Sequence, residues 1–210
     1  MVRGGAVLTG LSVVLLVAGC GQKSSGGSGE PSPPATLPGS APGAAGGSPA
    51  PSGSAAPATL PDTCADVLTL DELDKVVGHT VPGRSVYILG KDEPKIHRTG
   101  RVTCRYGVHK LGRTTVVPVE VGLSAYSDVG SAADRIRVTV ADQRTHGATP
   151  VDVSLGGTPG TVLLNPATAL LVFVTGQRTA AISITKDVAT GDRARDVLIQ
   201  LGTAVLAHVG

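Results

Sequence analysis

The chain has 210 residues and a formal net charge of +2, with no Trp and a single Phe. So balanced a charge lacks the basic surplus that binding to a phosphate backbone requires, and this excludes nucleic acid as a partner. The scarcity of aromatic residues also argues against a platform on which bases or sugars stack.

The first 20 residues predict export and a lipid anchor. Arg3 precedes an apolar run over 6–18, which is typical of a secretory signal peptide and shorter than the roughly 20 residues that span a membrane. Val17-Ala18-Gly19-Cys20 then resembles the bacterial lipobox, whose cysteine receives diacylglyceryl and palmitoyl chains after the preceding peptide is removed. We therefore expect a lipoprotein signal peptide over 1–19 and lipid attachment at Cys20, on the extracytoplasmic face of the cell membrane. The alternatives are an ordinary cleavage site with an incidental cysteine, or an uncleaved anchor.

A linker is expected between the anchor and the folded part of the chain. Of the 40 residues over 21–60, 33 are Gly, Pro, Ser or Ala, and they show no apolar periodicity. Such a composition buries too little surface to offset the entropy of ordering. We expect the anchored cysteine and a disordered linker over 20–61, and one folded domain over 62–210, which is long enough for a core of its own.

The two remaining cysteines, Cys64 and Cys104, are most simply explained by a disulfide in an exported protein. The alternative is a metal or redox pair, which would favour a CxxC spacing or neighbouring histidines, and the sequence has neither.

In the first half of the domain, Thr69-Leu70-Asp71-Glu72 predicts a capping box that opens a short helix, and Gly78 is placed to end it. The segment 79–100 is expected to be irregular apart from a short strand over 86–89. Two strands follow, over 102–108 and 115–123, joined by a loop over 109–114. Pro118 lacks an amide hydrogen, so an edge position or a bulge is expected there.

In the second half, Ser127-Asp128 opens a helix that is predicted to reach about residue 144. Strands are expected over 151–155 and 161–164, separated by a glycine turn over 156–160, and a hairpin over 169–175 and 179–185. An amphipathic helix over 192–209 closes the domain. The apolar stripe expected on the helix after Asp128 comprises Val129, Ala132, Ala133, Ile136 and Val140. This order predicts an α+β fold with a mostly antiparallel sheet packed by helices.

No motif in the sequence predicts chemistry. It has no G-x-S-x-G elbow, no phosphate-binding loop with its lysine, and no pair of histidines at helical spacing. We therefore expect no catalytic residue, metal ligand or cofactor, and the ligand-binding residues stay unidentified. The first hypothesis is a non-enzymatic sensor or accessory module that binds another envelope protein or a small apolar ligand. The alternative is an envelope hydrolase or wall-modifying enzyme whose site is assembled from dispersed residues such as His97, Asp128 and His146.

The chain resembles the DUF3558 family of actinobacterial lipoproteins. The resemblance rests first on the lipobox and the spacer. It rests further on the cysteine motifs Asp62-Thr63-Cys64 and Cys104-Arg105-Tyr106, on the helix motif over 68–73 with Gly78, and on the glycine turn Leu155-Gly156-Gly157. Arg105 and Gly160 depart from the usual pattern. The resemblance implies an envelope lipoprotein with a Cys64–Cys104 disulfide. Similar domains include extracellular sensor domains of receptor kinases, which implies binding rather than chemistry.

Overall fold

A computed structural model describes residues 58–210, so the expected signal peptide, Cys20 and almost all of the predicted linker lie outside the described residues. The helices are α1 (Leu70–Val77), η1 (Pro94–Ile96, a 3-10 turn), α2 (Val129–Thr145) and α3 (Gly191–Val209). The strands are β1 (Arg84–Gly90), β2 (Arg98–Leu111), β3 (Thr114–Val116), β4 (Val119–Tyr126), β5 (Thr149–Leu155), β6 (Thr158–Leu164), β7 (Thr168–Thr175) and β8 (Arg178–Thr185).

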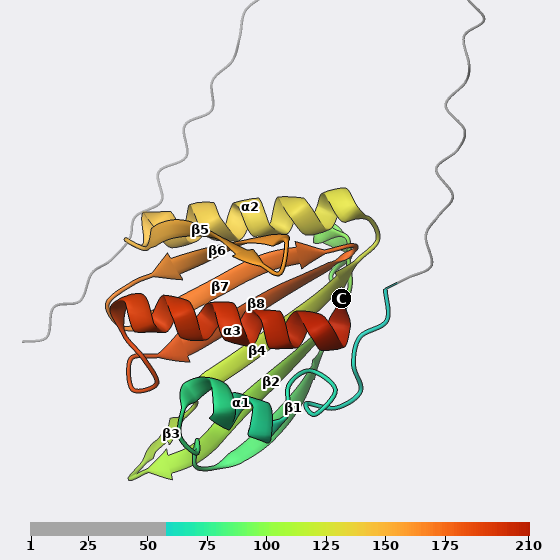
Figure 1. Cartoon of the computed structure of the whole chain (residues 1–210). Helices are drawn as coiled ribbons and strands as arrows, with labels where there is room; N and C mark the ends of the chain where they lie inside the picture. The colour runs from blue at the N-terminus through green and yellow to red at the C-terminus, as the bar shows by residue number, and fades with distance from the viewer. Residues whose placement is uncertain (1–57) are drawn as a thin grey trace, which may run out of the picture. The chain divides into compact units, whose positions relative to one another are not determined.

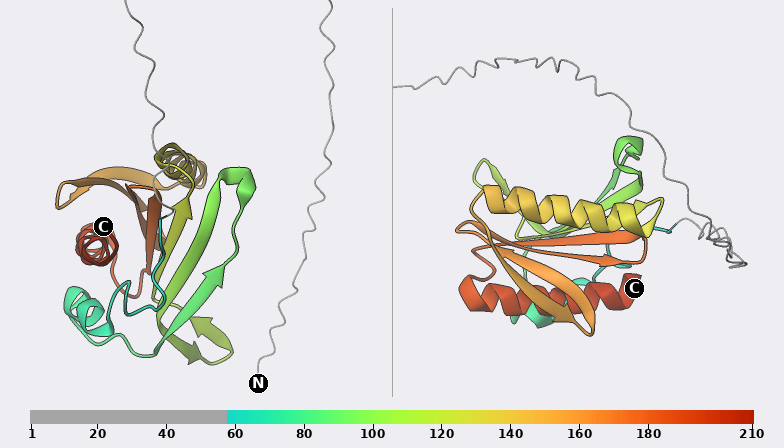
Figure 2. Two further views of the ribbon diagram at one scale, coloured as in Figure 1. Left: turned by 90° about the vertical axis from the view of Figure 1, so that its right-hand side faces the viewer. Right: turned by 90° about the horizontal axis from the view of Figure 1, so that it is seen from above.

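The strands form one antiparallel sheet in the order β1-β2-β4-β8-β7-β6-β5, and β3 pairs with the end of β2. Figure 1 shows α3 lying across the sheet with α1 beside it. Figure 2, which looks along α2 and α3 in its left panel, places these two helices on opposite faces of the sheet. The predicted α+β fold, a single domain with an antiparallel sheet packed by helices, is confirmed.

The main core lies between the sheet and α3. One stripe of α3 is buried, as expected for the amphipathic helix predicted at the end of the chain. The stripe comprises Ala194, Val197, Leu198, Leu201, Gly202, Val205 and Val209. Gly202 brings the helix against the sheet, because a Cβ there would lie 2.5 Å from Leu171 Cδ2 and 3.2 Å from Leu155 Cδ1. The apolar run over 169–173 and the alternation of β4 supply the facing surface.

The predicted capping box opens α1. The Thr69 hydroxyl accepts a hydrogen bond from the Glu72 amide, and the Glu72 carboxylate accepts one from the Thr69 amide at 2.9 Å. Gly78 ends the helix in the left-handed conformation, with φ of 89°. Leu73 and Val77 are buried, whereas Leu70 is at the surface, so α1 covers the core with a narrow stripe.

Two predicted loops are shorter than expected, and the short strand expected over 86–89 is longer. The 79–100 segment contains the seven-residue edge strand β1, and only Gly112-Arg113 separate β2 from β3. These strands alternate weakly in polarity because much of their length is exposed, so the sequence pattern does not mark their ends. Likewise the glycine turn is only Gly156-Gly157, both at positive φ, and 158–160 belongs to β6.

Pro118 interrupts the expected strand over 115–123 rather than marking an edge. The chain divides there into β3 and β4, and β4 lies inside the sheet between β2 and β8. Proline has no amide hydrogen to donate, so the ladder stops before it. Its carbonyl remains useful, accepting a hydrogen bond from the Thr185 amide at 3.0 Å. The expected edge position is therefore wrong, and in place of the bulge expected as its alternative the strand is broken between Val116 and Val119.

Candidate functional site

Helix α2 covers its face of the sheet incompletely. Asp128 caps it, accepting a hydrogen bond from the Ser131 amide at 2.7 Å, and the helix continues through its β-branched second half to Thr145. Its only fully buried residue is Ala132, while Ile136 and Val140 are half-buried. Val129, predicted to join the apolar stripe, is 56% exposed because the first turn extends beyond the sheet contact. Hollows are left where the helix fails to seal the sheet.

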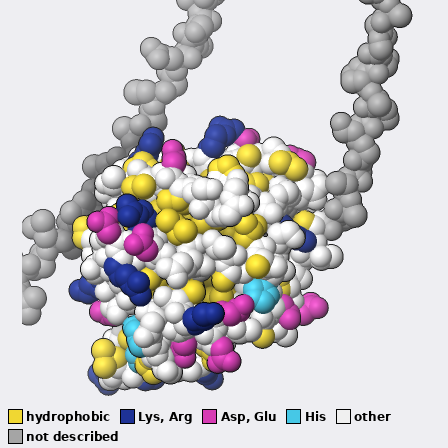
Figure 3. All heavy atoms as spheres, in the orientation of Figure 1, with side chains coloured by type: hydrophobic (Ala, Val, Ile, Leu, Met, Phe, Trp, Pro, Cys, Tyr) yellow, Lys and Arg dark blue, Asp and Glu magenta, His cyan; other side chains and the backbone are white. Residues whose placement is uncertain are grey.

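The larger hollow is an apolar pocket of about 560 Å³ between α2 and strands β5–β7. Asp152, Gly160 and Thr161 also line it, and its apolar lining comprises Ala133, Ile136, Val153, Pro159, Val172, Phe173 and Val174. Figure 3 shows hydrophobic side chains gathered at the surface between α2 and α3, on the face that carries the β5–β6 hairpin. This pocket is the kind of site that the sequence hypothesis of a small apolar ligand requires.

The second hollow, of about 200 Å³, lies between α2 and strands β2, β4 and β8. Three arginines line it, and we call it the arginine groove. Its polar lining comprises Arg98, Arg101, Ser124, Tyr126, Arg135, Thr139 and Thr179. Ile136 and Val172 line both hollows, so the two lie back to back beneath α2.

The backbone of β2 brings two of the arginines together. Arg101 faces Ser124 on β4, and Arg98 faces Tyr126, with an irregularity in the register between Arg98 and Gly100. An extra residue in one strand re-aims the side chains beyond it. Arg98 and Arg101, three apart in sequence, therefore line the same hollow. Arg135 joins them from α2.

A glycine makes room for one guanidinium group. Arg101 Nη2 lies 3.9 Å from the position that a Cβ on Gly122 would occupy. The Ala181 carbonyl oxygen lies at 3.8 Å from the same position. The Arg101 side chain thus reaches across β4 over a residue without a side chain. A larger residue at 122 would share that space.

The arginines of this face differ in how well they are paired. Arg105 is neutralised by Glu120, with Nε and Oε2 2.7 Å apart. Arg98 contacts Glu93 through Nη2 at 2.9 Å, yet its buried Nε has no acceptor. Among the described residues, Arg101 and Arg135 form no ion pair. Three arginines and one carboxylate leave the groove with a positive surplus.

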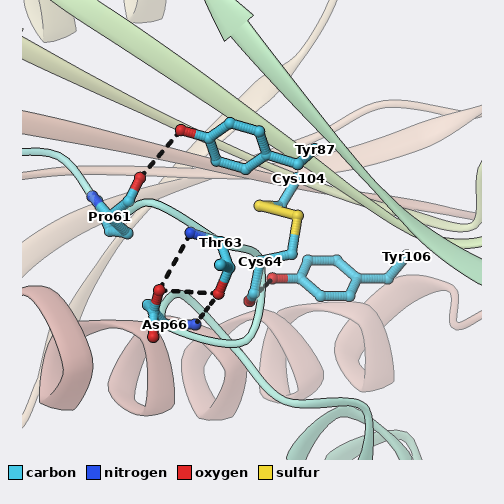
Figure 4. Close-up of a disulfide and its surroundings, with 7 residues drawn as sticks. All are labelled: Pro61, Thr63, Cys64, Asp66, Tyr87, Cys104 and Tyr106. Carbon is cyan, nitrogen blue, oxygen red and sulfur yellow. Dashed lines mark hydrogen bonds between the residues drawn. A yellow bond between two sulfur atoms is a disulfide. The ribbon is translucent and has the colours of Figure 1, made fainter.

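The predicted disulfide between Cys64 and Cys104 is present, with the two Cα atoms 5.4 Å apart (Figure 4). It fastens the segment ahead of α1 to β2. The buried Tyr106 hydroxyl donates to the Cys64 carbonyl at 2.8 Å, and burial raises the pKa of this hydroxyl far above its usual range. The Tyr87 hydroxyl donates to the Pro61 carbonyl nearby. This arrangement is structural and has no free nucleophile.

The dispersed residues of the hydrolase hypothesis do not form one site. His97 and Asp128 are near the start of α2, but His146 caps its other end, roughly 25 Å away at 1.5 Å per residue. The Ser131 amide, followed by the Ser131 and Ser127 hydroxyls, lowers the pKa of the Asp128 carboxyl, which is fully exposed. Helix capping accounts for this shift, so it does not indicate a catalytic acid or base.

The other histidines are also separate. His79 lies after α1, and His109 lies in β2. Residues 58–210 include no group of three metal-ligating side chains. His208, at the end of α3, contacts both carboxylate oxygens of Glu72, at 3.0 and 3.1 Å, a link that the sequence did not predict. None of the helices in the described part of the chain is both long and apolar enough to span a membrane.

The sequence interpretation missed the arginine groove. Arg98 falls in the segment expected to be irregular, Arg101 precedes the expected strand over 102–108, and Arg135 lies more than 30 residues away on another element. The register irregularity in β2 and the glycine at 122 bring three of these groups to one hollow. Only the pairing of strands, which the sequence does not show, reveals this.

Comparisons with known proteins yield a structural similarity and no match in sequence. No family model and no curated protein matches it. Its structure is similar to the crystal structure of the extracellular domain of PknH from Mycobacterium tuberculosis, with a TM-score of 0.42 and 11% sequence identity. That similarity covers 69% of this chain and 94% of the PknH domain. A likeness of this degree gives no basis for carrying a function over.

Proposed function

We propose that this protein is a lipid-anchored, extracytoplasmic binding module that holds a ligand beneath α2 and performs no chemistry on it. The observation that carries the proposal is the incomplete packing of α2, which buries one residue fully and leaves a hollow on each side. A helix of 17 residues that packed only for stability would be expected to bury a continuous stripe.

The compartment is supported by the two kinds of cysteine. The Cys64–Cys104 disulfide suits an oxidising environment outside the cytoplasm. The lipobox ending in Cys20, which lies outside the described residues, supplies the anchor in this proposal. Two or more acyl chains would make the attachment stable, since one chain alone gives only marginal binding.

The anchor is tested by fractionation of cells that produce the wild-type chain or Cys20→Ala. The wild type is expected in the membrane fraction after carbonate washing, and the variant is expected to lose its lipid and leave that fraction. Mass spectrometry of the N-terminal peptide reports the lipid directly. A Cys20→Ala chain that stays in the washed membrane would contradict the anchor.

The binding module is tested by a thermal-shift screen of the full chain in detergent against lipids and cell-wall fragments. A ligand that binds the native state only raises the midpoint of unfolding. The matched pair of variants is Val174→Asp, which places a charge in the apolar pocket, and Val138→Asp, which places one on the exposed side of α2. Loss of the shift in Val174→Asp alone would locate the ligand. The absence of any stabilising ligand, together with the absence of a crosslinked partner in cells, would remove the proposal.

A further inference from the structure

We propose that the arginine groove is a binding site for a phosphate group, carried either by a soluble phosphate ester or by a lipid headgroup. The proposal rests on the proposed binding function and names the ligand chemistry of one of the two hollows. It uses Arg98, Arg101 and Arg135, with the hydroxyl groups of Ser124 and Thr179 on the same wall.

The Arg98 side chain has a hydrogen-bond donor without a partner in the described residues. The Arg98 side chain is only 14% exposed, and two contacts, to the Glu93 carboxylate and to the Lys91 carbonyl at 3.4 Å, occupy Nη2. Its Nε is buried and has no acceptor in the described residues. A buried donor without a partner costs about 1–3 kcal/mol, so an acceptor that reaches Nε would recover this free energy.

Arg101 carries a positive charge that has no carboxylate partner among the described residues. Glu120 neutralises Arg105, two positions further along the same face of β2, whereas Arg101 has no such partner opposite. The residues that face Arg101 are Ser124 and, beside it, Gly122, which are small and uncharged. An ion that binds here displaces no internal carboxylate from Arg101. On a chain whose net charge is only +2, three arginines around 200 Å³ are a local concentration.

The number and directions of the donors around the groove favour one kind of anion. A carboxylate is planar, and a single guanidinium group satisfies both of its oxygens. Three guanidinium groups and two hydroxyls that reach one hollow from β2, α2, β4 and β8 offer more donors, in more directions, than a carboxylate accepts. The oxygens of a phosphate group are tetrahedrally arranged and carry more charge, so they match this arrangement better.

The test follows the Nε–Hε signals of arginine by ¹⁵N NMR in the full chain in detergent, during titration with inorganic phosphate at constant ionic strength. The Arg98 signal, assigned from Arg98→Lys, is expected to shift on saturation. Arg101→Gln and Arg135→Gln are each expected to weaken phosphate binding roughly tenfold or more, the loss expected for one hydrogen bond between charged groups. Arg137→Gln is the matched control, because that arginine is on the same helix, is exposed, and pairs with Asp134.

A variant that gains a carboxylate distinguishes loss of phosphate binding from misfolding. In Ser124→Asp the new carboxylate lies directly opposite Arg101 and can pair with it, so phosphate binding should be lost while the midpoint of unfolding is kept or raised. Titrations with glycerol phosphate and with the soluble lipid dihexanoyl phosphatidylglycerol then distinguish the source of the phosphate. Binding of either one that Arg101→Gln abolishes supports the site and identifies that source.

Three results would overturn the site. They are an Arg98 signal that phosphate leaves unmoved, phosphate binding that survives Arg101→Gln with Arg135→Gln, and acetate binding as tight as that of phosphate. A screened ligand that Val174→Asp abolishes and the double arginine variant retains would remove the phosphate site while leaving the binding module in place.

Discussion

The two faces of the sheet are covered by helices of similar length that pack in opposite ways. α3 has 19 residues and buries seven of them, whereas α2 has 17 and buries one. The face under α3 and α1 also carries the disulfide and the fully buried side chain of Tyr106. The face under α2 carries unpaired arginines and open space. One face therefore supplies the stability of the domain, and the other is free to serve a ligand.

Removing the disulfide tests the packed face at its strongest point. Cys64→Ser with Cys104→Ser is expected to lower the free energy of unfolding by about 4 kcal/mol, because the closed loop of 40 residues no longer restricts the unfolded chain. Equilibrium urea unfolding, with the oxidised wild type as reference, measures the change. A loss below about 1 kcal/mol would mean that the loop is already ordered without the bond.

Truncating one apolar side chain on each helix compares the faces directly. Leu201→Ala on α3 should cost about 3 kcal/mol of unfolding free energy, since it opens a cavity in a closed core. Ile136→Ala on α2 should cost about 1 kcal/mol, because that side chain already borders two open hollows. Urea unfolding of both variants gives the ratio. Equal losses would show that α2 is as important to stability as α3.

A single methyl group tests how closely α3 approaches the sheet. Gly202→Ala should destabilise the domain by about 1–2 kcal/mol, since the clash with Leu171 outweighs the gain in helix propensity. The exposed neighbour Thr203→Ala is the control and should be neutral or slightly stabilising. Thermal unfolding of the pair is sufficient. A more stable Gly202→Ala would mean that the helix can move outward at little cost.

The smallest effect is expected at the rim of the packed face, where Glu72 links α1 to His208 on α3. Hydrogen bonds from the Thr69 amide and hydroxyl, followed by the one from His208, lower the pKa of Glu72 from 4.5 to about 2. Because the pKa in the folded state is depressed, this stabilisation is present above about pH 4.5 and is lost as the pH falls toward 2.

Urea unfolding at pH 6 and pH 3 checks this. Glu72→Gln should be less stable than the wild type at pH 6, and the difference should shrink at pH 3. Asp71→Asn, on the same turn but without these hydrogen bonds, is the control. A difference that stays constant with pH would exclude the carboxylate charge as its cause.

Much of the fold follows from local sequence patterns. The capping box at Thr69, the glycine that ends α1, the hairpin around Gly176 and the stripe of α3 are all confirmed, because each depends on residues close together in the chain. The strands β1, β2 and β6 were each predicted too short. Their residues are partly exposed, and pairing with neighbours rather than alternation sets their length.

The candidate site lies beyond the reach of such patterns. The disulfide was predictable, because two cysteines in a chain that is expected to be exported leave few alternatives. The arginine groove depends on a register irregularity between Arg98 and Gly100 and on the place of Gly122 in a neighbouring strand. Neither has a local signature. Arginines are common outside the core, and only the meeting of three of them with a single carboxylate, that of Glu93, distinguishes this group.

The position of the disulfide has a mechanical consequence. Arg178 holds the Thr59 carbonyl at 2.9 Å and the Val209 carbonyl at 2.7 Å, and Cys64 follows five residues after Thr59. Tension along the preceding chain would break these weak contacts and then reach a covalent bond to Cys104, inside β2. Arg101 is three residues away on that strand, so under the proposed function the anchored segment and the ligand would both be connected to β2.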